Sequence, residues 1–232
     1  MQITLFPETW RSANQYLISR GTRHYLIDPS HPPEKTASEL TLLLATHGHF
    51  DHIAAIDQWR EGRDLELVIS EEDQKLLADP HANCSELFRL PQSFSPAERL
   101  FAGDSFELEE GLELKVYPTP GHTAGSLTFL LTLSTAEEVV YEDNEGHELF
   151  SPLLTLGQRE EAVALFTGDT LFAYSIGRTD LPTGSDQEMT ESLRFLKRFL
   201  ETLPSELPLL PGHGQATTVG VVRESHPYLL QI

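Results

Sequence analysis

The sequence Thr46-His47-Gly48-His49-Phe50-Asp51-His52 places three imidazoles and one carboxylate within six residues. It directly follows the apolar run Leu42-Leu43-Leu44-Ala45, which is typical of a buried strand, so the cluster falls at the carboxyl end of a strand. Isolated histidines are commonly solvated, but this density of ligand-type side chains predicts a metal site.

The local backbone pattern supports the same prediction. Alternation along an extended loop directs His47, His49 and Asp51 to one side, and Gly48 has no Cβ, so the chain can bend closely. His52 begins an expected helix that continues from Ile53 to Trp59. One short segment can therefore offer ligands to two adjacent metal positions.

Length and composition narrow the class of protein. The chain has 232 residues, which suits one large domain with an ample core, and no window approaches the roughly 18 apolar residues of a membrane span. The N-terminal sequence shows no signal-peptide pattern, so we expect a cytoplasmic protein. The single cysteine, Cys84, allows no intrachain disulfide, and the metal ligands must be mainly nitrogen and oxygen.

The charge balance excludes some partners. A formal charge of −20, from 36 acids and 16 bases, argues against binding to nucleic acid or to an anionic membrane. An anionic small-molecule substrate remains compatible, because divalent cations reverse the local charge of a site.

Apolar periodicity and turn residues predict the element order. Strands are expected at 14–19 and 24–28, which flank a turn with Gly21 and suit a hairpin. Further strands are expected at 42–45, 66–69, 105–108, 112–117, 126–131, 139–142, 147–150, 164–167 and 207–210. Helices are expected at 53–60, at 70–78 with Ser70 as its cap and Asp73 at the capping-box position, after the capping box Ser185/Glu188, and after Thr218. This order indicates one α/β (α+β) domain over 1–232. An exposed, acidic, hairpin-like insertion is expected at about 134–162, which carries eight acids and one base, with a solvated His147.

Three further strand ends carry candidate ligands, each directly after a glycine: His122, Asp169 and His213. With the 47–52 loop they supply five histidines and two aspartates, enough for two divalent cations that share a carboxylate. Asp28 ends the second expected strand, and it is either a turn residue or a carboxylate that accepts a hydrogen bond from a ligand histidine.

These motifs resemble the metallo-β-lactamase-fold hydrolases, and among them the short bacterial type of glyoxalase II-like (hydroxyacylglutathione hydrolase-like) proteins. The resemblance extends from about Asn14 to Leu229, apart from the acidic insertion. The matching motifs are T-H-x-H-x-D-H at 46–52, P-G-H-T-x-G-S at 120–126, T-G-D-T-L-F at 167–172, G-R-T-D at 177–180 and G-H-G at 212–214.

The resemblance implies a four-layered αββα sandwich and a complete ligand set. It implies that His47, His49 and His122 hold one metal and that Asp51, His52 and His213 hold a second. Asp169 would bridge the two, and Asp28 would lie behind the ligands.

The implied activity is hydrolysis of a thioester such as S-lactoylglutathione by a metal-bridging hydroxide, with Asp51 and Asp169 as catalytic residues. Zinc is the favoured metal, and iron or manganese also suits such ligands. The only partner indicated is a small-molecule substrate, and the sequence indicates no oligomeric state.

Parts of the family pattern are absent, and alternatives stay open. Full-length glyoxalase II enzymes have a C-terminal helical segment with glutathione contacts that this sequence does not show. Arg178 is a candidate for binding a substrate carboxylate, or else a structural partner of Asp180. A persulfide dioxygenase with a single iron on His47, His122 and Asp169, or a lactonase, is compatible with the same fold.

Overall fold

The computed structural model describes residues 1–32 and 40–232, which divide into two compact units. The first unit comprises Met1–Phe101 and Glu138–Pro152, and the second comprises Ala102–Glu137 and Leu153–Ile232. The assignment of the whole chain to one domain stays a prediction.

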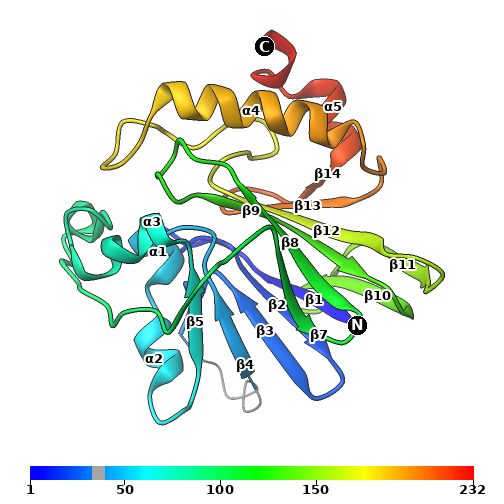
Figure 1. Ribbon diagram of the computed structural model, residues 1–232, viewed down its shortest axis with the longest axis horizontal. Coiled ribbons are helices and arrows are strands. Elements are labelled where there is room, and N and C mark those ends of the chain that lie inside the picture. Colours follow the sequence, from blue (N-terminus) through cyan, green and yellow to red (C-terminus); the bar gives the residue numbers. More distant parts are fainter. Residues whose placement is uncertain (33–39) are drawn as a thin grey trace. The chain divides into compact units, whose positions relative to one another are not determined.

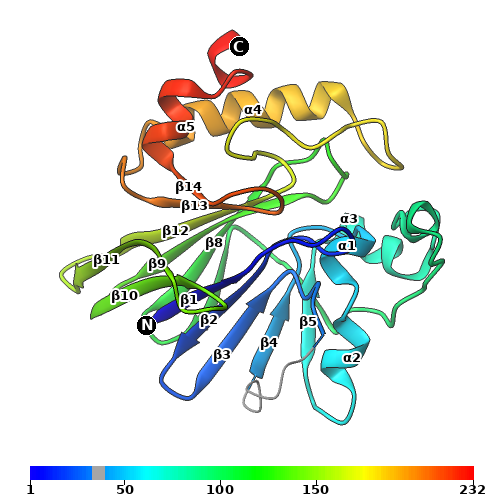
Figure 2. The same ribbon diagram turned by 180° about the vertical axis from the view of Figure 1, so that it is seen from behind.

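The first unit is built on a mixed sheet (Figure 2), in the order β11-β10-β1-β2-β3-β4-β5-β6. The strands β1 to β3 are antiparallel, and β3 to β6 are parallel. The strand bounds are Gln2–Phe6 (β1), Gln15–Arg20 (β2), Arg23–Ile27 (β3), Leu40–Leu44 (β4), Glu66–Ile69 (β5), Arg99–Leu100 (β6), Ala136–Asp143 (β10) and Glu148–Leu156 (β11). The predicted hairpin around Gly21 is confirmed by the pairing of β2 with β3, whereas the short strand β1 was not predicted.

Short helices connect β4 to β5 and β5 to β6 in this unit. They are α1 (Phe50–Ile53), α2 (Ile56–Arg60), α3 (Glu71–Gln74) and the 3-10 helices η1 (Lys75–Ala78) and η2 (Ser85–Phe88). Phe50, Ile53, Ile56 and Trp59 pack with buried side chains of β3, β4 and β5 in one apolar cluster.

The prediction of one continuous helix over 53–60 is wrong. The helix is interrupted between α1 and α2, because the N–H of Ala55 donates to the carbonyl of Pro29 (3.0 Å) and not to a carbonyl within the helix. The capping of the next helix is confirmed, since Ser70 Oγ accepts from the N–H of Asp73.

The second unit is built on a six-stranded mixed sheet in the order β14-β13-β12-β9-β8-β7. Its strands are β7 (Ser105–Glu109), β8 (Leu112–Pro118), β9 (Leu127–Leu133), β12 (Glu161–Gly168), β13 (Pro208–Pro211) and β14 (Thr217–Thr218). Figure 1 shows α4 (Asp186–Leu200) and α5 (Val219–Ser225) lying along one side of this sheet, with η3 (Leu229–Gln231) after α5. Neither these nor any other described helix has the length and apolar character needed to cross a membrane.

Helix α4 forms as its sequence predicts. Ser185 Oγ accepts from the N–H of Glu188 (3.2 Å) at the N-terminus. The stripe Met189, Leu193, Leu196 and Leu200 is buried against Leu130, Leu165 and Leu209 of the sheet.

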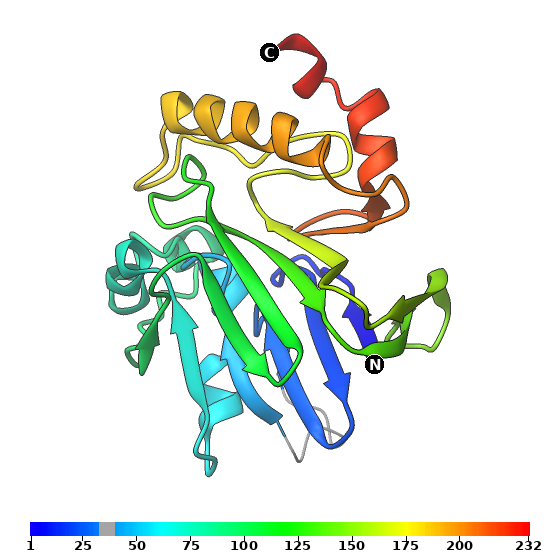
Figure 3. The same cartoon turned by 45° about the vertical axis from the view of Figure 1, so that its right-hand side comes forward.

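The predicted acidic hairpin is present as β10 and β11, which reverse at the turn seen in Figure 3. It differs from an exposed arm in one respect, because β10 pairs in parallel with β1. Val139 and Tyr141 are consequently buried. The turn itself is solvated, as predicted, and its His147 side chain is 69% exposed.

Asp143 and His147 form a titratable pair at this turn. Asp143 Oδ2 lies 2.9 Å from His147 Nδ1, and this hydrogen bond raises the pKa of His147 above its ordinary range. A raised pKa in the folded state means that the pair stabilises the turn below the ordinary histidine pKa of about 6.5, and that this stabilisation is lost as pH rises through the raised value.

We expect an NMR titration to give His147 a pKa above that of a model peptide, and Asp143→Asn to return it to the ordinary range. Glu145→Gln is the control, because the Glu145 carboxylate is farther away (3.8 Å) and contributes least. An unchanged titration in Asp143→Asn would contradict the pairing.

Candidate metal centre

Residues 46–52, called the metal loop below, lie at the carboxyl end of β4, as the sequence predicts. Its three histidines are at most 2% exposed, and their Nε2 atoms are buried. The His47 ring lies 4.9 Å from that of His49 and 4.1 Å from that of His52, between centroids. Ligand atoms of His47 and His49, of His47 and His52, and of Asp51 and His52 lie within 4.8 Å of each other. The first unit therefore gathers four predicted ligands in one place.

Asp28 joins the end of β3 to this loop. Its Oδ1 accepts from the N–H of Thr46 (2.7 Å), and its Oδ2 accepts from Thr46 Oγ1 (2.9 Å) and lies 2.9 Å from His52 Nδ1. The residue is 1% exposed and has a positive φ of 54°. It thus has both roles that the sequence left open, since it turns the chain and supports a candidate ligand histidine. Burial, and next the charge of Asp28, raise the pKa of Tyr16 well above its ordinary value.

These hydrogen bonds determine where the histidine protons lie. Thr46 Oγ1 donates its only hydrogen to Asp28, so it accepts from His47 Nδ1, 3.2 Å away. His52 Nδ1 likewise donates to Asp28. In the neutral form of both rings, Nε2 therefore carries the lone pair that a metal ion requires.

Asp73 fixes the loop from its other side. Its Oδ2 accepts from the N–H of Gly48 (2.9 Å), between the two histidines His47 and His49, and Asp73 is fully buried. A Cβ on Gly48 would lie 3.1 Å from the Asp73 carbonyl oxygen, so glycine permits this close approach. The sequence identified Asp73 only as part of a helix cap. Its contact with Gly48 depends on tertiary structure and has no sequence signal.

The second unit gathers the remaining predicted ligands at the ends of β8, β12 and β13. His122 Nε2 lies 3.4 Å and His213 Nε2 3.6 Å from Asp169 Oδ2. The N–H of Gly212 donates to the Gly168 carbonyl (2.9 Å), which joins the two strand ends that carry Asp169 and His213.

The G-R-T-D segment supports this cluster through its backbone. His122 Nδ1 donates to the carbonyl of Arg178 (2.7 Å), and the N–H of Gly177 donates to the carbonyl of Asp169 (2.9 Å). A Cβ on Gly177 would lie 2.0 Å from that carbonyl oxygen, so only glycine fits. Sequence reasoning missed this role of Gly177 and Arg178, although the G-R-T-D motif itself was noted.

The Arg178 side chain makes a bidentate ion pair with Asp180, at 2.6 and 2.7 Å. The pair lowers the pKa of Asp180 to about 2. Both side chains are exposed, and the contact corresponds to the structural alternative that the sequence left open.

The protonation of His122 provides a test of whether a cation fits. Because its Nδ1 donates to a carbonyl, the neutral ring directs the lone pair of Nε2 toward Asp169 Oδ2, only 3.4 Å away. Two facing acceptors repel each other unless a proton or a metal ion lies between them. Imidazole nitrogen and carboxylate oxygen are donors that zinc, iron and manganese accept. The residues of this unit fit a divalent cation.

We expect Asp73→Ala to weaken metal binding by about tenfold, because loss of a group that orients ligands typically has an effect of this size. Glu72→Ala is the matched control, since Glu72 is the exposed neighbour of Asp73 in the same helix. Competition with a chromogenic chelator measures the affinity, and equal affinities for the two variants would contradict the role given to Asp73.

Comparison with known proteins defines the family. The sequence profile of the metallo-beta-lactamase superfamily matches residues 9–134, more than half of the chain. Hydroxyacylglutathione hydrolase GloC of Haemophilus influenzae is 30% identical over 241 residues, which cover 99% of this chain and 98% of GloC.

Two solved structures are similar over nearly their whole length. The BLEG-1 B3 metallo-β-lactamase has a TM-score of 0.77 and 26% identity, covering 98% of this chain and 99% of the other. TTHA1623 in a di-iron-bound form has a TM-score of 0.70 and 28% identity, covering 97% and 98%. The predicted fold is confirmed: this chain is a metallohydrolase of the metallo-β-lactamase superfamily, with the α+β fold of that superfamily.

Proposed function

We propose that this metallohydrolase binds two divalent metal ions and cleaves a thioester such as S-lactoylglutathione. The observation that supports metal binding is the contact between His122 Nε2 and Asp169 Oδ2, which a cation would stabilise. Similarity to a hydroxyacylglutathione hydrolase over nearly the whole chain supports the thioester as substrate.

The ligand assignment follows the family pattern. His47, His49 and His122 would hold the first metal ion, and Asp51, His52 and His213 would hold the second, with Asp169 available to both. Each unit supports this assignment separately, because the described contacts leave Nε2 as the basic nitrogen of His47, His52 and His122.

Zinc is the metal that we expect, because the ligands are mainly imidazoles. Iron or manganese is also compatible with a mixed set of imidazoles and carboxylates. The di-iron form of TTHA1623, a similar protein, supports two metals per chain and iron as the alternative.

When bound, the metal pair supplies a water nucleophile at neutral pH and an electrophile for the substrate carbonyl. The carboxylate of Asp51 would accept a hydrogen bond from that water and so orient it toward the thioester carbon. Asp28 and the Arg178 carbonyl hold the His52 and His122 rings in the orientation that keeps Nε2 available. The chain needs no cysteine nucleophile for this chemistry, and Cys84 is buried, with 4% exposure.

The substrate is tested by parallel assays of the purified protein. We expect cleavage of S-lactoylglutathione, followed by release of the free thiol, without oxygen uptake. Oxygen consumption with glutathione persulfide and no thioester cleavage would instead assign a dioxygenase with a single iron. A β-lactam and a lactone serve as further substrates, and a preference for either would also contradict the proposal.

Asp169→Ala tests the shared ligand. We expect kcat to fall by more than about 100-fold and the metal content to fall with it, because ligand loss acts more strongly than loss of a supporting group. His147→Ala is the control and should change neither, since His147 is an exposed turn residue paired with Asp143. Full metal content and activity in Asp169→Ala would exclude Asp169 as a shared ligand.

A further inference from the structure

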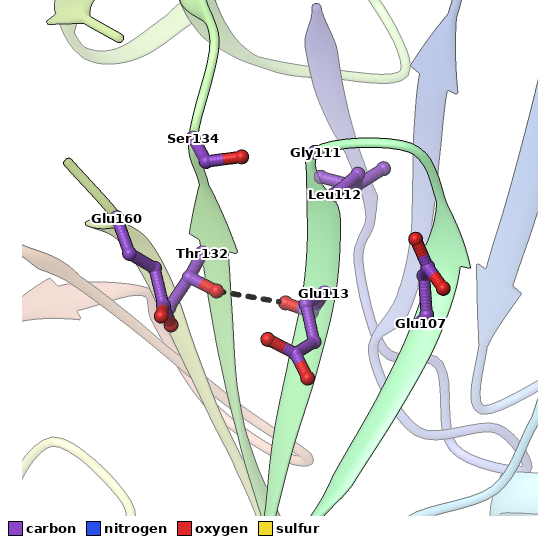
Figure 4. A pocket seen from close by; sticks show the side chains of 7 residues that line it. All are labelled: Glu107, Gly111, Leu112, Glu113, Thr132, Ser134 and Glu160. Atoms are coloured by element: carbon purple, nitrogen blue, oxygen red, sulfur yellow. Dashed lines mark hydrogen bonds between the residues drawn. The ribbon is translucent and has the colours of Figure 1, made fainter. Parts of the chain in front are cut away.

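One pocket of the second unit is acidic. Glu107, Glu113 and Glu160 line it beside the turn at Gly111 that joins β7 to β8 (Figure 4), and Lys115 is paired with two of these carboxylates. These carboxylates repel an anion, so we do not assign this pocket to the substrate.

A second pocket, in the first unit, has the opposite character. It measures about 370 Å³, within the size range of small-ligand sites. Its apolar lining residues are Pro32, Phe50, Ala54, Ala55 and Leu90. Its polar lining residues are Thr9, Arg11, Ser12, Ser30, His31, Gln58 and Gln92.

The charge of this second pocket is unusual for the protein. Among the described lining residues, Arg11 alone has a permanent charge and none carries a carboxylate. The whole chain has 36 acids against 16 bases, so a lining of this kind is unlike the rest of the sequence. An apolar wall beside a guanidinium, amides and hydroxyls suits a flexible organic anion.

The loop that presents Arg11 is held in place by its own hydrogen bonds. The N–H of Thr9 donates to the carbonyl of Ser12 (2.9 Å), and their hydroxyls are 2.7 Å apart. Ser12 Oγ also contacts His31 Nε2 (3.2 Å) across the pocket wall. The Arg11 guanidinium lies over the ring of Trp10, 4.8 Å from its centroid, which limits its freedom.

The pocket adjoins the metal loop within the same unit. Phe50 and Ala54, which line it, flank Asp51 in sequence, and the N–H of Ala13 donates to the carbonyl of Asp51 (2.9 Å). A molecule in this pocket would therefore lie beside the segment of the metal loop that carries Asp51. Arg178, the other arginine considered for this role, is paired with Asp180.

We propose that this pocket binds the carboxylate-bearing end of the substrate's leaving thiol, with Arg11 as the residue that selects for an anion. The proposal rests on the thioesterase function given above. It assigns part of the substrate preference to the loop between β1 and β2.

The test compares Arg11→Gln and Arg11→Glu with Arg63→Gln. Arg63 is a matched control because its guanidinium also lies over a tryptophan, Trp59 at 5.7 Å, and it does not line the pocket. For S-lactoylglutathione we expect KM to rise about threefold to tenfold in Arg11→Gln, and further in Arg11→Glu, with little change in kcat. For phenyl thioacetate, a neutral thioester, KM should stay unchanged, which also shows that the variants are folded.

Calorimetric binding of S-methylglutathione separates this inference from the proposed function. If the wild-type protein cleaves neither thioester, the proposed function is wrong. Weaker binding of S-methylglutathione by Arg11→Glu, but not by Arg63→Gln, would still support the pocket. The inference is overturned if the wild-type protein does not bind S-methylglutathione. It is equally overturned if both arginine positions give the same KM and affinity as the wild type.

Discussion

The buried carboxylate of Asp28 is the constraint on which the metal loop depends. Burying a charge is costly unless hydrogen bonds compensate it, and here the N–H and hydroxyl of Thr46 and the imidazole of His52 provide that compensation. The same three contacts tie the end of β3 to the end of β4 and to α1. Without Asp28, His52 Nδ1 and the Thr46 hydroxyl would lose their common acceptor, and with it the contacts that set the protonation of the His52 and His47 rings.

The second unit uses the same principle with different groups. There a backbone carbonyl, that of Arg178, takes the place of the carboxylate and holds the Nδ1 proton of His122. Gly177 allows this segment to approach Asp169 because any side chain would collide with the Asp169 carbonyl. In both units, the neutral imidazole therefore keeps the lone pair of Nε2 available, and this is the form that binds a divalent cation.

The sequence predicted the local features well, because each depends on neighbouring residues. The hairpin around Gly21, the strand at 66–69 and the caps at Ser70 and Ser185 follow from turn chemistry and periodicity. Strand β1 was missed, and its pairing with β10 joins segments far apart in the sequence that no local pattern reveals. The break between α1 and α2 was missed because it depends on a carbonyl from Pro29.

In the candidate site, too, the sequence predicts the features that depend on neighbouring residues and misses the contacts between distant ones. Histidines and aspartates after glycines at strand ends were recognisable from the sequence. The contacts of Asp73 with Gly48 and of the Arg178 carbonyl with His122 join residues 25 and 56 positions apart, so no local pattern reveals them.

The central proposal, which follows the family pattern, is that ligands from both units bind the same pair of metal ions. A crystal structure with anomalous scattering data from the metal-loaded protein tests this most directly. We predict two anomalous peaks, one bound by His47, His49 and His122 and the other by Asp51, His52 and His213, with Asp169 contacting both. A single peak, or peaks bound by residues of only one unit, would contradict the account.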